Sequence, residues 1–362
     1  MRRRKQNIIY RKQRKLFFAI FIFVCILSII VNKQAIFLYF TNTHKSFIST
    51  ICAKYPQYKK YNNPSLSMIL SKSLKDVKGL YGIAVKHFIT GETYYYNQDK
   101  VFSTASLYKV WIMAMTYERI KNGTLQLSTS LSGDLTELLE EMGVSPELAQ
   151  QQEGTITYSV EEAINKMITI SDNNSALLLT HVLKQSAVPE FLKRYNYLKS
   201  MGGNGFPTST PDDMLMFFED LYREKLIDKK YSKMMVDILK EQELNYFLPA
   251  RLPKDVTIAH KTGELNTVSN DAGIVFAEGG PYGIVIFTDS GDPSGAVNRG
   301  AQISKIVYDY FQNDYVRRVE NKKIEQQAEF ISKIVYVGMV ILIIVTIVVL
   351  IRFVYVIISK YK

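Results

Sequence analysis

A serine and a lysine three residues apart, Ser106 and Lys109, are the first residues whose types and spacing suggest chemistry. Residues three apart on a helix lie on the same face, so the hydroxyl and the amine would be neighbours. A hydroxyl is a weak nucleophile until a base removes its proton, and an amine whose pKa is lowered by burial can be that base. The pair alone is weak evidence, because Ser359 and Lys362 have the same spacing in a basic tail.

Two later motifs strengthen the interpretation. Ser171-Asp172-Asn173 follows an apolar stretch, and Lys261-Thr262-Gly263 lies in a strand-like region. The order Ser-x-x-Lys, Ser-Asp-Asn and Lys-Thr-Gly is the signature set of serine enzymes that recognise penicillin. By these motifs the chain resembles the class A β-lactamases and their relatives from about Pro64 to about Phe311, with shorter matches at 246–253 and 270–275.

The order of the elements and the resemblance together imply an α/β fold of the β-lactamase/transpeptidase type. An antiparallel sheet flanked by helices is expected beside a second, all-helical lobe, with the active site between the two. Hydrophobic periodicity predicts strands at 80–88, 92–96, 256–262, 271–277 and 282–289, and helices at 65–75, 107–122, 134–153, 159–170, 174–183, 189–197, 217–226, 231–239 and 297–311, with a further helix start at 210–213. His87, in the first hairpin, is expected to be exposed or at a sheet edge.

The resemblance also implies roles for residues on the helical side of the site. Ser106 would attack the carbonyl of a β-lactam or of an acyl-D-alanyl-D-alanine peptide, and Lys109 would accept its proton. Ser171 would relay a proton to the leaving nitrogen. Asn173 would hold the substrate's side-chain amide, while Asp172 would brace the turn by accepting backbone N–H bonds.

The other roles fall on the strand side. Lys261 and Thr262 would bind the substrate carboxylate, because a cation and a hydroxyl match an anionic group. The backbone N–H groups of Ser106 and Glu264 would form the oxyanion hole. Gly263 would keep the strand clear of the ligand.

One part of the family pattern is missing from the sequence. In the family, a long loop between the Ser-Asp-Asn turn and a Thr-Pro helix start carries a Glu that activates the deacylating water. Only residues 174–209 lie between these points here, and 198–209 contain no Asp or Glu. Glu190 is the one acid in the interval, and its place near a predicted helix start indicates a helix N-terminal charge. We therefore expect acylation with weak deacylation.

The net charge of +11 is distributed unevenly. Residues 1–61 carry +13, residues 62–316 carry −7 and residues 317–362 carry +5. The basic excess therefore belongs to the ends of the chain, where it fits a membrane-associated segment, and nucleic-acid binding is disfavoured.

The cysteines and histidines indicate neither a disulfide framework nor a metal mechanism. Cys25 and Cys52 both precede the catalytic region. No pair of histidines has zinc-ligand spacing with a cysteine or a glutamate, and no cofactor is expected. The four histidines are His44, His87, His181 and His260.

Two apolar runs flank the catalytic region. Basic residues before the run at 16–31 favour a cytoplasmic N-terminus, and 334–351 is an uncharged run of 18 residues, long enough to span a membrane. A cleaved signal peptide is the alternative for the first run, although no small-x-small site follows it closely. The predicted organisation is a basic cytoplasmic tail (1–15), a transmembrane anchor (16–40), a tether (41–63), a β-lactamase-like serine hydrolase domain (64–316), a linker (317–333) and a transmembrane helix (334–358).

Two function classes follow. The first is a membrane-anchored serine hydrolase of class A β-lactamase type whose catalytic domain is extracytoplasmic and whose termini are both cytoplasmic. The second is a penicillin-binding D-alanyl-D-alanine peptidase, or a non-hydrolytic sensor of β-lactams or peptidoglycan. A sensor needs a cytoplasmic output, and the predicted inside segments are short, which favours the enzyme. The expected partners are a β-lactam or a peptidoglycan stem peptide, and the membrane through two spans.

Overall fold

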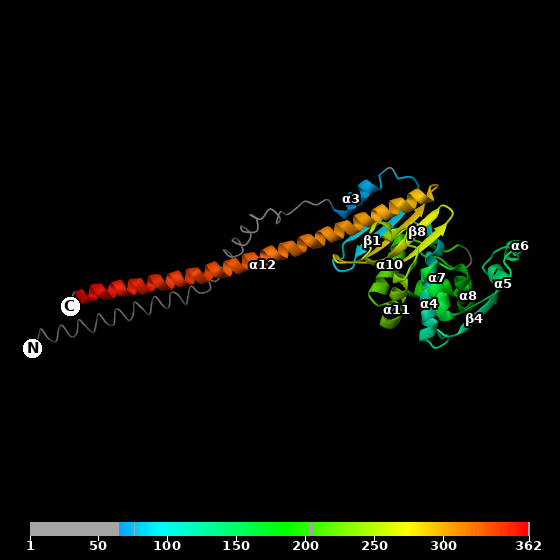
Figure 1. Cartoon of the computed structure of the whole chain (residues 1–362), viewed down its shortest axis with the longest axis horizontal. Coiled ribbons are helices and arrows are strands. Elements are labelled where there is room, and N and C mark those ends of the chain that lie inside the picture. The colour runs from blue at the N-terminus through cyan, green and yellow to red at the C-terminus, as the bar shows by residue number, and fades with distance from the viewer. Residues whose placement is uncertain (1–64, 76, 203–205, 361–362) are drawn as a thin grey trace, which may run out of the picture. The chain divides into compact units, whose positions relative to one another are not determined.

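The computed structural model describes residues 65–75, 77–202 and 206–360. The predicted first span and the tether lie outside these residues. The chain divides into two compact units, one of residues 63–316 and one of residues 1–62 with 317–362, and each is considered by itself. Figure 1 shows the elements of the larger unit, which holds every predicted site residue.

A five-stranded antiparallel sheet forms the centre of the larger unit, as predicted. Its strand order is β2-β1-β9-β8-β7, so the first hairpin lies beside the last strand. Most residues of the three inner strands are buried on both faces, which explains their long apolar runs. The strands are β1 (Leu80–His87), β2 (Thr93–Tyr96), β7 (Thr257–Leu265), β8 (Val268–Ala277) and β9 (Gly280–Asp289).

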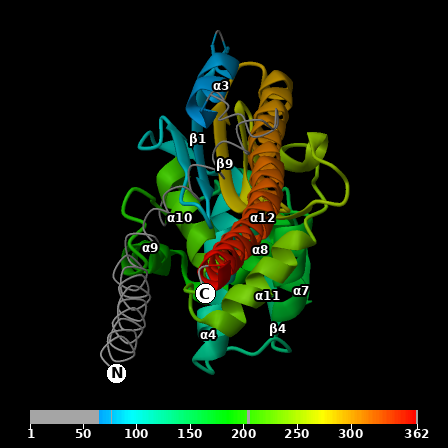
Figure 2. The same ribbon diagram turned by 90° about the vertical axis from the view of Figure 1, so that its left-hand side faces the viewer.

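Two helices cover one face of the sheet. They are α3 (Leu66–Ser73) and the first part of α12 (Pro293–Lys360), which lie over the strands in Figure 2. Leu70, Ile284 and Ile303 belong to the apolar cluster on this face. The short η4 (Leu248–Arg251) contributes Leu248 to the same cluster.

A mainly helical lobe covers the other face. Its central helix is α4 (Lys109–Lys121), of which every residue from 109 to 117 is buried. The surrounding helices are α5 (Leu135–Glu141), α6 (Pro146–Ala149), α7 (Val160–Thr169), α8 (Asn173–Leu183), η3 (Gln185–Ala187), α9 (Val188–Arg194), α10 (Pro211–Tyr222) and α11 (Lys229–Lys240). The predicted antiparallel sheet flanked by helices is confirmed.

The prediction that this lobe is all-helical was wrong. The strands β4 (Ser130–Asp134) and β5 (Thr155–Ser159) pair antiparallel beside α5 and α6. A second short pair joins β3 (Phe102–Ser103) to β6 (Thr208–Ser209). Ser, Gly and Asp in β4 are poor strand formers, and pairing with a distant segment overrides that preference.

Three helix starts are capped by side-chain oxygens. Ser159 Oγ accepts a hydrogen bond from Glu162 N at 3.1 Å, and Asp172 Oδ2 accepts one from Ser175 N at 2.7 Å. The third cap is Thr210, which precedes Pro211 at the first helical position. Each side-chain oxygen satisfies an N–H that lacks an intrahelical partner.

His87 is buried, and the prediction of an exposed or edge position was wrong. Its side chain is 1% exposed, because α12 lies over the end of β1. The Phe311 ring of α12 packs edge-to-face against the His87 imidazole, with 4.7 Å between the ring centroids. His87 Nε2 lies 3.1 Å from the Gly279 carbonyl oxygen, and Nδ1 accepts from Thr90 N at 3.1 Å. The ring therefore organises the β1–β2 turn.

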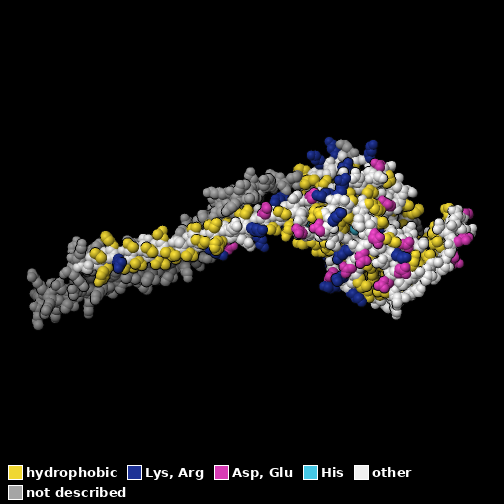
Figure 3. All heavy atoms as spheres, in the orientation of Figure 1, with side chains coloured by type: hydrophobic (Ala, Val, Ile, Leu, Met, Phe, Trp, Pro, Cys, Tyr) yellow, Lys and Arg dark blue, Asp and Glu magenta, His cyan; other side chains and the backbone are white. Residues whose placement is uncertain are grey.

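The C-terminal part of α12 carries an apolar surface. Among the described residues, one helix is long and apolar enough to cross a membrane. This candidate runs over Pro293–Phe353 and covers residues 334–353 of the predicted span at 334–358. Hydrophobic side chains are exposed along this part of the helix in Figure 3, among them Ile341, Leu342 and Ile351. Exposed apolar side chains over such a length are unfavourable in water and favourable in lipid.

Candidate active site

Ser106 lies in η2 (Ala105–Tyr108), a 3-10 turn that leads directly into α4. The prediction had the helix begin as an α-helix at residue 107. Ala105 has a φ of 44°, in the left-handed region that alanine rarely adopts. Strain at such a residue persists only where the surroundings hold it, and Thr104 N donates to the Pro207 carbonyl oxygen at 2.9 Å just before it. The backbone thus holds Ser106 in one orientation.

Lys109 joins the first two motifs, although 62 residues separate them. Its Nζ donates to the Ser171 carbonyl oxygen and to Asn173 Oδ1, both at 2.7 Å, and to Ser171 Oγ at 3.3 Å. The side chain is 1% exposed. Burial lowers the pKa of Lys109 to about 8, against the opposing effect of the Asp172 carboxylate. An amine with this pKa can accept a proton near neutral pH.

Lys261 of β7 is also fully buried. Its Nζ donates to the Thr262 carbonyl oxygen at 2.9 Å. Burial and, to a smaller extent, the charge of Lys109 lower the pKa of Lys261 to about 7, against the opposing effect of Asp271. Because the charge of Lys109 acts on the pKa of Lys261, the protonation states of the two predicted lysines depend on each other.

Gly263 brings β7 against the backbone of η2. A Cβ at this position would lie 2.6 Å from the Thr104 carbonyl oxygen and 3.1 Å from Ser106 N. The sequence predicted that this glycine leaves room for a ligand, but backbone atoms occupy that space. The close approach instead sets the strand that carries Glu264 beside the Ser106 amide.

A first prediction follows from this contact. Gly263→Ala is expected to force the strand and the turn apart, because backbone atoms cannot rotate away as a side chain can. Overpacking of this kind costs about 1–3 kcal/mol. We expect a lower Tm in thermal unfolding and a slower reaction with penicillin. Gly291→Ala is the matched control, since nothing lies within 4 Å of a Cβ there. Equal effects of the two substitutions would contradict the prediction.

Two residues near the site carry roles that motif reasoning did not assign. Asn270 Nδ2 donates to the Ser103 carbonyl oxygen at 2.9 Å and Asn270 Oδ1 accepts from Thr288 N at 3.0 Å, so this side chain ties β8 to the segment before Ser106. The sequence signal for Asn270 was the short match to the family at 270–275. The Tyr246 hydroxyl interacts with the Thr262 and Glu264 side chains, and burial raises the pKa of Tyr246.

An apolar cavity of about 390 Å³ lies beside α4. The described residues that line it include no Asp or Glu. They are Tyr108, Trp111, Ile112, Met142, Gly143, Thr180, Gln185, Val188, Gly202, Phe206 and Pro207. Glu190 lies in the first turn of α9 and is exposed, as expected of a helix N-terminal charge.

The described residues contain no group of three or more His, Cys, Asp or Glu side chains that could hold a metal ion. The polar groups gathered around Lys109 are hydroxyl, amide and carbonyl groups. Such an arrangement suits nucleophilic acyl transfer by a serine with an amine as its base.

The fold and this cluster define a β-lactamase-like serine hydrolase domain. In a comparison with protein-family models, the Beta-lactamase enzyme family matches residues 65–311. The chain therefore belongs to the β-lactamase enzyme family. A search of curated proteins finds no match to the sequence.

Solved structures with the same fold include penicillin-related and β-lactamase proteins. PBP-A matches with a TM-score of 0.61 at 23% identity, over 68% of this chain and 96% of PBP-A. A PBP-A variant solved as an acyl-enzyme complex with penicillin G matches with 0.60 at 22% identity, over 68% and 95%. A representative class A β-lactamase from Bacteroides cellulosilyticus matches with 0.59 at 25% identity, over 70% and 100%.

Proposed function

We propose that the protein is a membrane-anchored, extracytoplasmic serine hydrolase of class A β-lactamase type, acylated on Ser106 by β-lactams and slow to deacylate. The observation that carries the proposal is the buried Lys109 amine held between Ser171 and Asn173, three residues after the nucleophile in the sequence. Hydrolysis of a chromogenic cephalosporin by the full-length protein, with mass spectrometry of Ser106, tests it.

The proposed acylation starts at Ser106. Its Oγ attacks the lactam carbonyl carbon while Lys109 Nζ accepts the hydroxyl proton. The carbonyl oxygen becomes an oxyanion that accepts hydrogen bonds from the backbone N–H groups of Ser106 and Glu264. The C–N bond then breaks, and the nitrogen takes a proton from Ser171 Oγ, which Lys109 replenishes. The contact between Lys109 and Ser171 supports this relay.

Substrate binding is assigned to three side chains. Lys261 and Thr262 bind the carboxylate that β-lactams and wall peptides share. Asn173 Oδ1 already accepts from Lys109, which leaves its Nδ2 to donate to a carbonyl oxygen of the substrate's side-chain amide. The low pKa of Lys261 makes this binding sensitive to pH.

The pH dependence of acylation provides a second prediction. The limiting rate should rise with pH through about 8, where Lys109 loses its proton and becomes a base. Carboxylate binding should weaken as pH rises through about 7, where Lys261 loses its charge. The second-order rate constant should therefore peak between these values. A penicillin methyl ester, which lacks the carboxylate, should show only the rise. A profile that is flat from pH 6 to 9 would exclude both assignments.

The alternative is a D-alanyl-D-alanine peptidase or a non-hydrolytic sensor. The observation that favours a sensor is the lack of Asp and Glu in residues 198–209, because an acyl-enzyme persists when no carboxylate activates a water molecule. Comparison of a chromogenic cephalosporin with an acyl-D-alanyl-D-alanine peptide distinguishes the alternatives, since a peptidase releases D-alanine and a sensor turns over neither substrate.

The membrane arrangement provides a third prediction. The apolar surface of α12 supports a span at 334–358, and the basic residues of 1–15 support an inside N-terminus. Protease added to intact cells should cut the tether at 41–63, while tags at both ends stay protected. Immunoblots before and after lysis measure this. A C-terminal tag removed from outside would show that the second run does not span, or that the first run is cleaved and the orientation differs.

A further inference from the structure

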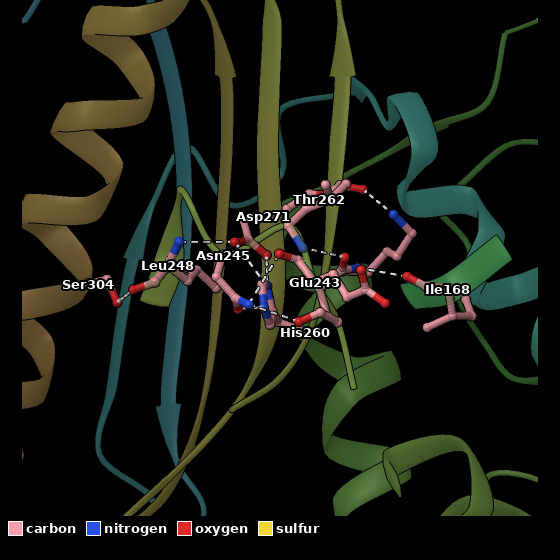
Figure 4. Close-up of polar contacts among 11 residues, drawn as sticks. Ile168, Glu243, Asn245, Leu248, His260, Thr262, Asp271 and Ser304 are labelled. Atoms are coloured by element: carbon pink, nitrogen blue, oxygen red, sulfur yellow. Dashed lines mark hydrogen bonds and ion pairs between the residues drawn. The ribbon is translucent and has the colours of Figure 1, made fainter. Parts of the chain in front are cut away.

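A buried polar network lies behind the strand that carries Lys261 (Figure 4). His260, the residue before this lysine, is 1% exposed, and Asp271 on the neighbouring strand is fully buried. Gly273 lies opposite His260 in the β7–β8 register. A Cβ on Gly273 would lie 2.3 Å from the Ala259 carbonyl oxygen and 2.6 Å from His260 Cβ, so the glycine allows β8 to lie close to β7 at His260. Because side chains alternate along a strand, His260 and Lys261 point to opposite faces of the sheet.

Asn245 fixes the proton on one ring nitrogen. Its Nδ2 donates to the carbonyl oxygens of Gln242 at 3.0 Å and Glu243 at 3.3 Å, which determines the orientation of the amide. Asn245 Oδ1 therefore faces His260 Nε2, at 3.1 Å. An amide oxygen only accepts hydrogen bonds, so Nε2 carries a hydrogen.

Asp271 determines the state of the other ring nitrogen. His260 Nδ1 lies 2.9 and 3.1 Å from the two carboxyl oxygens. Asp271 Oδ2 also accepts from Leu248 N at 3.0 Å, and a backbone donor favours the ionised carboxyl. An ionised carboxyl has no hydrogen to donate, so Nδ1 donates the hydrogen in this contact. Both ring nitrogens are then donors, and His260 is an imidazolium.

The network links the end of α7, on the helical side of the active site, to β7 on the sheet side. Gln242 Nε2 donates to the Ile168 carbonyl oxygen at 2.7 Å, and Glu243 N donates to the Thr169 carbonyl oxygen at 2.9 Å. These carbonyls end α7, immediately before the Ser171 turn. On the other side, the Leu248 carbonyl oxygen accepts from Ser304 Oγ of α12 at 2.8 Å. An unbroken series of hydrogen bonds therefore joins the end of α7 to β7.

We propose that His260 is a positioning residue: as an imidazolium paired with Asp271, it fixes Lys261 relative to the Ser171 turn and so governs binding of the substrate carboxylate. The inference rests on the proposed function. Asp271 is the charged side chain in direct contact with His260, and it also acts on the pKa values of Lys261 and Tyr246. From the 242–248 segment, Asn245 contacts His260 through its amide and Leu248 contacts Asp271 through its backbone N–H. Glu243 is the acid nearest to these contacts in the sequence and joins the network through its backbone, and the nearest α12 link, Ser304, is neutral.

The charge state is measured first, without substrate. The full-length chain in detergent micelles, labelled with ¹⁵N in its histidine rings, is examined by NMR at neutral pH. His260→Gln identifies the His260 signals by their loss, and His181→Gln, which removes an exposed histidine paired with Glu141, is the control. Two protonated ring nitrogens are expected. One bare ring nitrogen would overturn the imidazolium.

The positioning role is measured by acylation kinetics. His260→Gln is expected to raise the half-saturating concentration of benzylpenicillin about tenfold, the effect of weakening one charge-assisted contact. The limiting acylation rate should stay within about twofold, because this change removes ground-state binding. The methyl ester of benzylpenicillin should show little change, since it lacks the carboxylate. Asp271→Asn should reproduce the pattern.

These outcomes separate the inference from the proposed function. If the wild-type chain is not acylated at all, the proposed function fails, and the NMR spectrum still decides the charge of His260. If His260→Gln acts equally on benzylpenicillin and its ester, or leaves both unchanged, the positioning role is overturned. A general loss of fold would appear as a lower Tm with equal effects on the two substrates.

Discussion

A fluorescent penicillin is expected to label the wild-type chain and to leave Ser106→Ala unlabelled. The label is an ester with the serine oxygen, and alanine has no atom that can form this bond. Gel fluorescence measures the labelling, and mass spectrometry locates the modified peptide. Ser132→Ala is the matched control, because Ser132 is an exposed serine on β4 whose hydroxyl hydrogen-bonds to the Thr157 hydroxyl on β5. Labelling that survives in Ser106→Ala would remove the central assignment.

The same assay separates the nucleophile from its base. Lys109→Ala keeps the serine and should slow labelling by about a hundredfold to ten-thousandfold, the usual contribution of a general base. The substitution also leaves Ser171 and Asn173 without a buried partner, so the Tm must be measured alongside. Labelling at the wild-type rate would exclude Lys109 as the proton acceptor.

Hydrolysis of a chromogenic cephalosporin is expected to show a burst of product equal to the enzyme concentration, followed by a slow steady rate. Acylation needs groups that the site brings together, whereas deacylation needs an activated water molecule. Residues 198–209 contain no Asp or Glu, and Glu190 is exposed in the first turn of α9. Without a general base, the rate of deacylation should be lower by about a hundredfold to ten-thousandfold. This factor corresponds to about 3–5 kcal/mol in the activation free energy.

Rapid mixing measures the burst, and mass spectrometry of the quenched reaction should find the acyl-enzyme as the main species. A class A β-lactamase that carries the loop Glu serves as the reference and should turn over without a burst. Fast linear turnover by this protein would show that another group activates the water. Glu190→Gln would then be the next variant to assay, with Glu153→Gln, an exposed glutamate elsewhere in the same lobe, as its control.

The three motifs were predictable from sequence because each is short and its chemistry is local. Ser106 and Lys109 lie one turn apart on any helix, and the Asp172 cap needs only an N–H three residues ahead. The hairpin of β1 and β2 and the buried strands near the C-terminus were likewise visible as alternation and apolar runs. For these features the nearest neighbours in the chain are also the neighbours in space.

Other features depended on contacts that no local pattern encodes. The sequence around His87 suggested an exposed or edge position, but α12 covers this residue in the structure. The β4 segment is a strand because it pairs with β5. Gly263 belonged to a motif, yet its closest neighbours are the backbone atoms of Thr104 and Ser106. Each of these outcomes is decided by packing between elements that are distant along the chain.

By itself the sequence determined the family, the motif residues and the acid that is missing from the 198–209 loop, because these are matters of residue identity and short spacing. The tertiary structure alone decided that Lys109 and Lys261 are buried with lowered pKa values and that His260 lies between Asn245 and Asp271. A protonation state depends on the solvent excluded and the charges brought near a group, and both are set only when distant segments pack together.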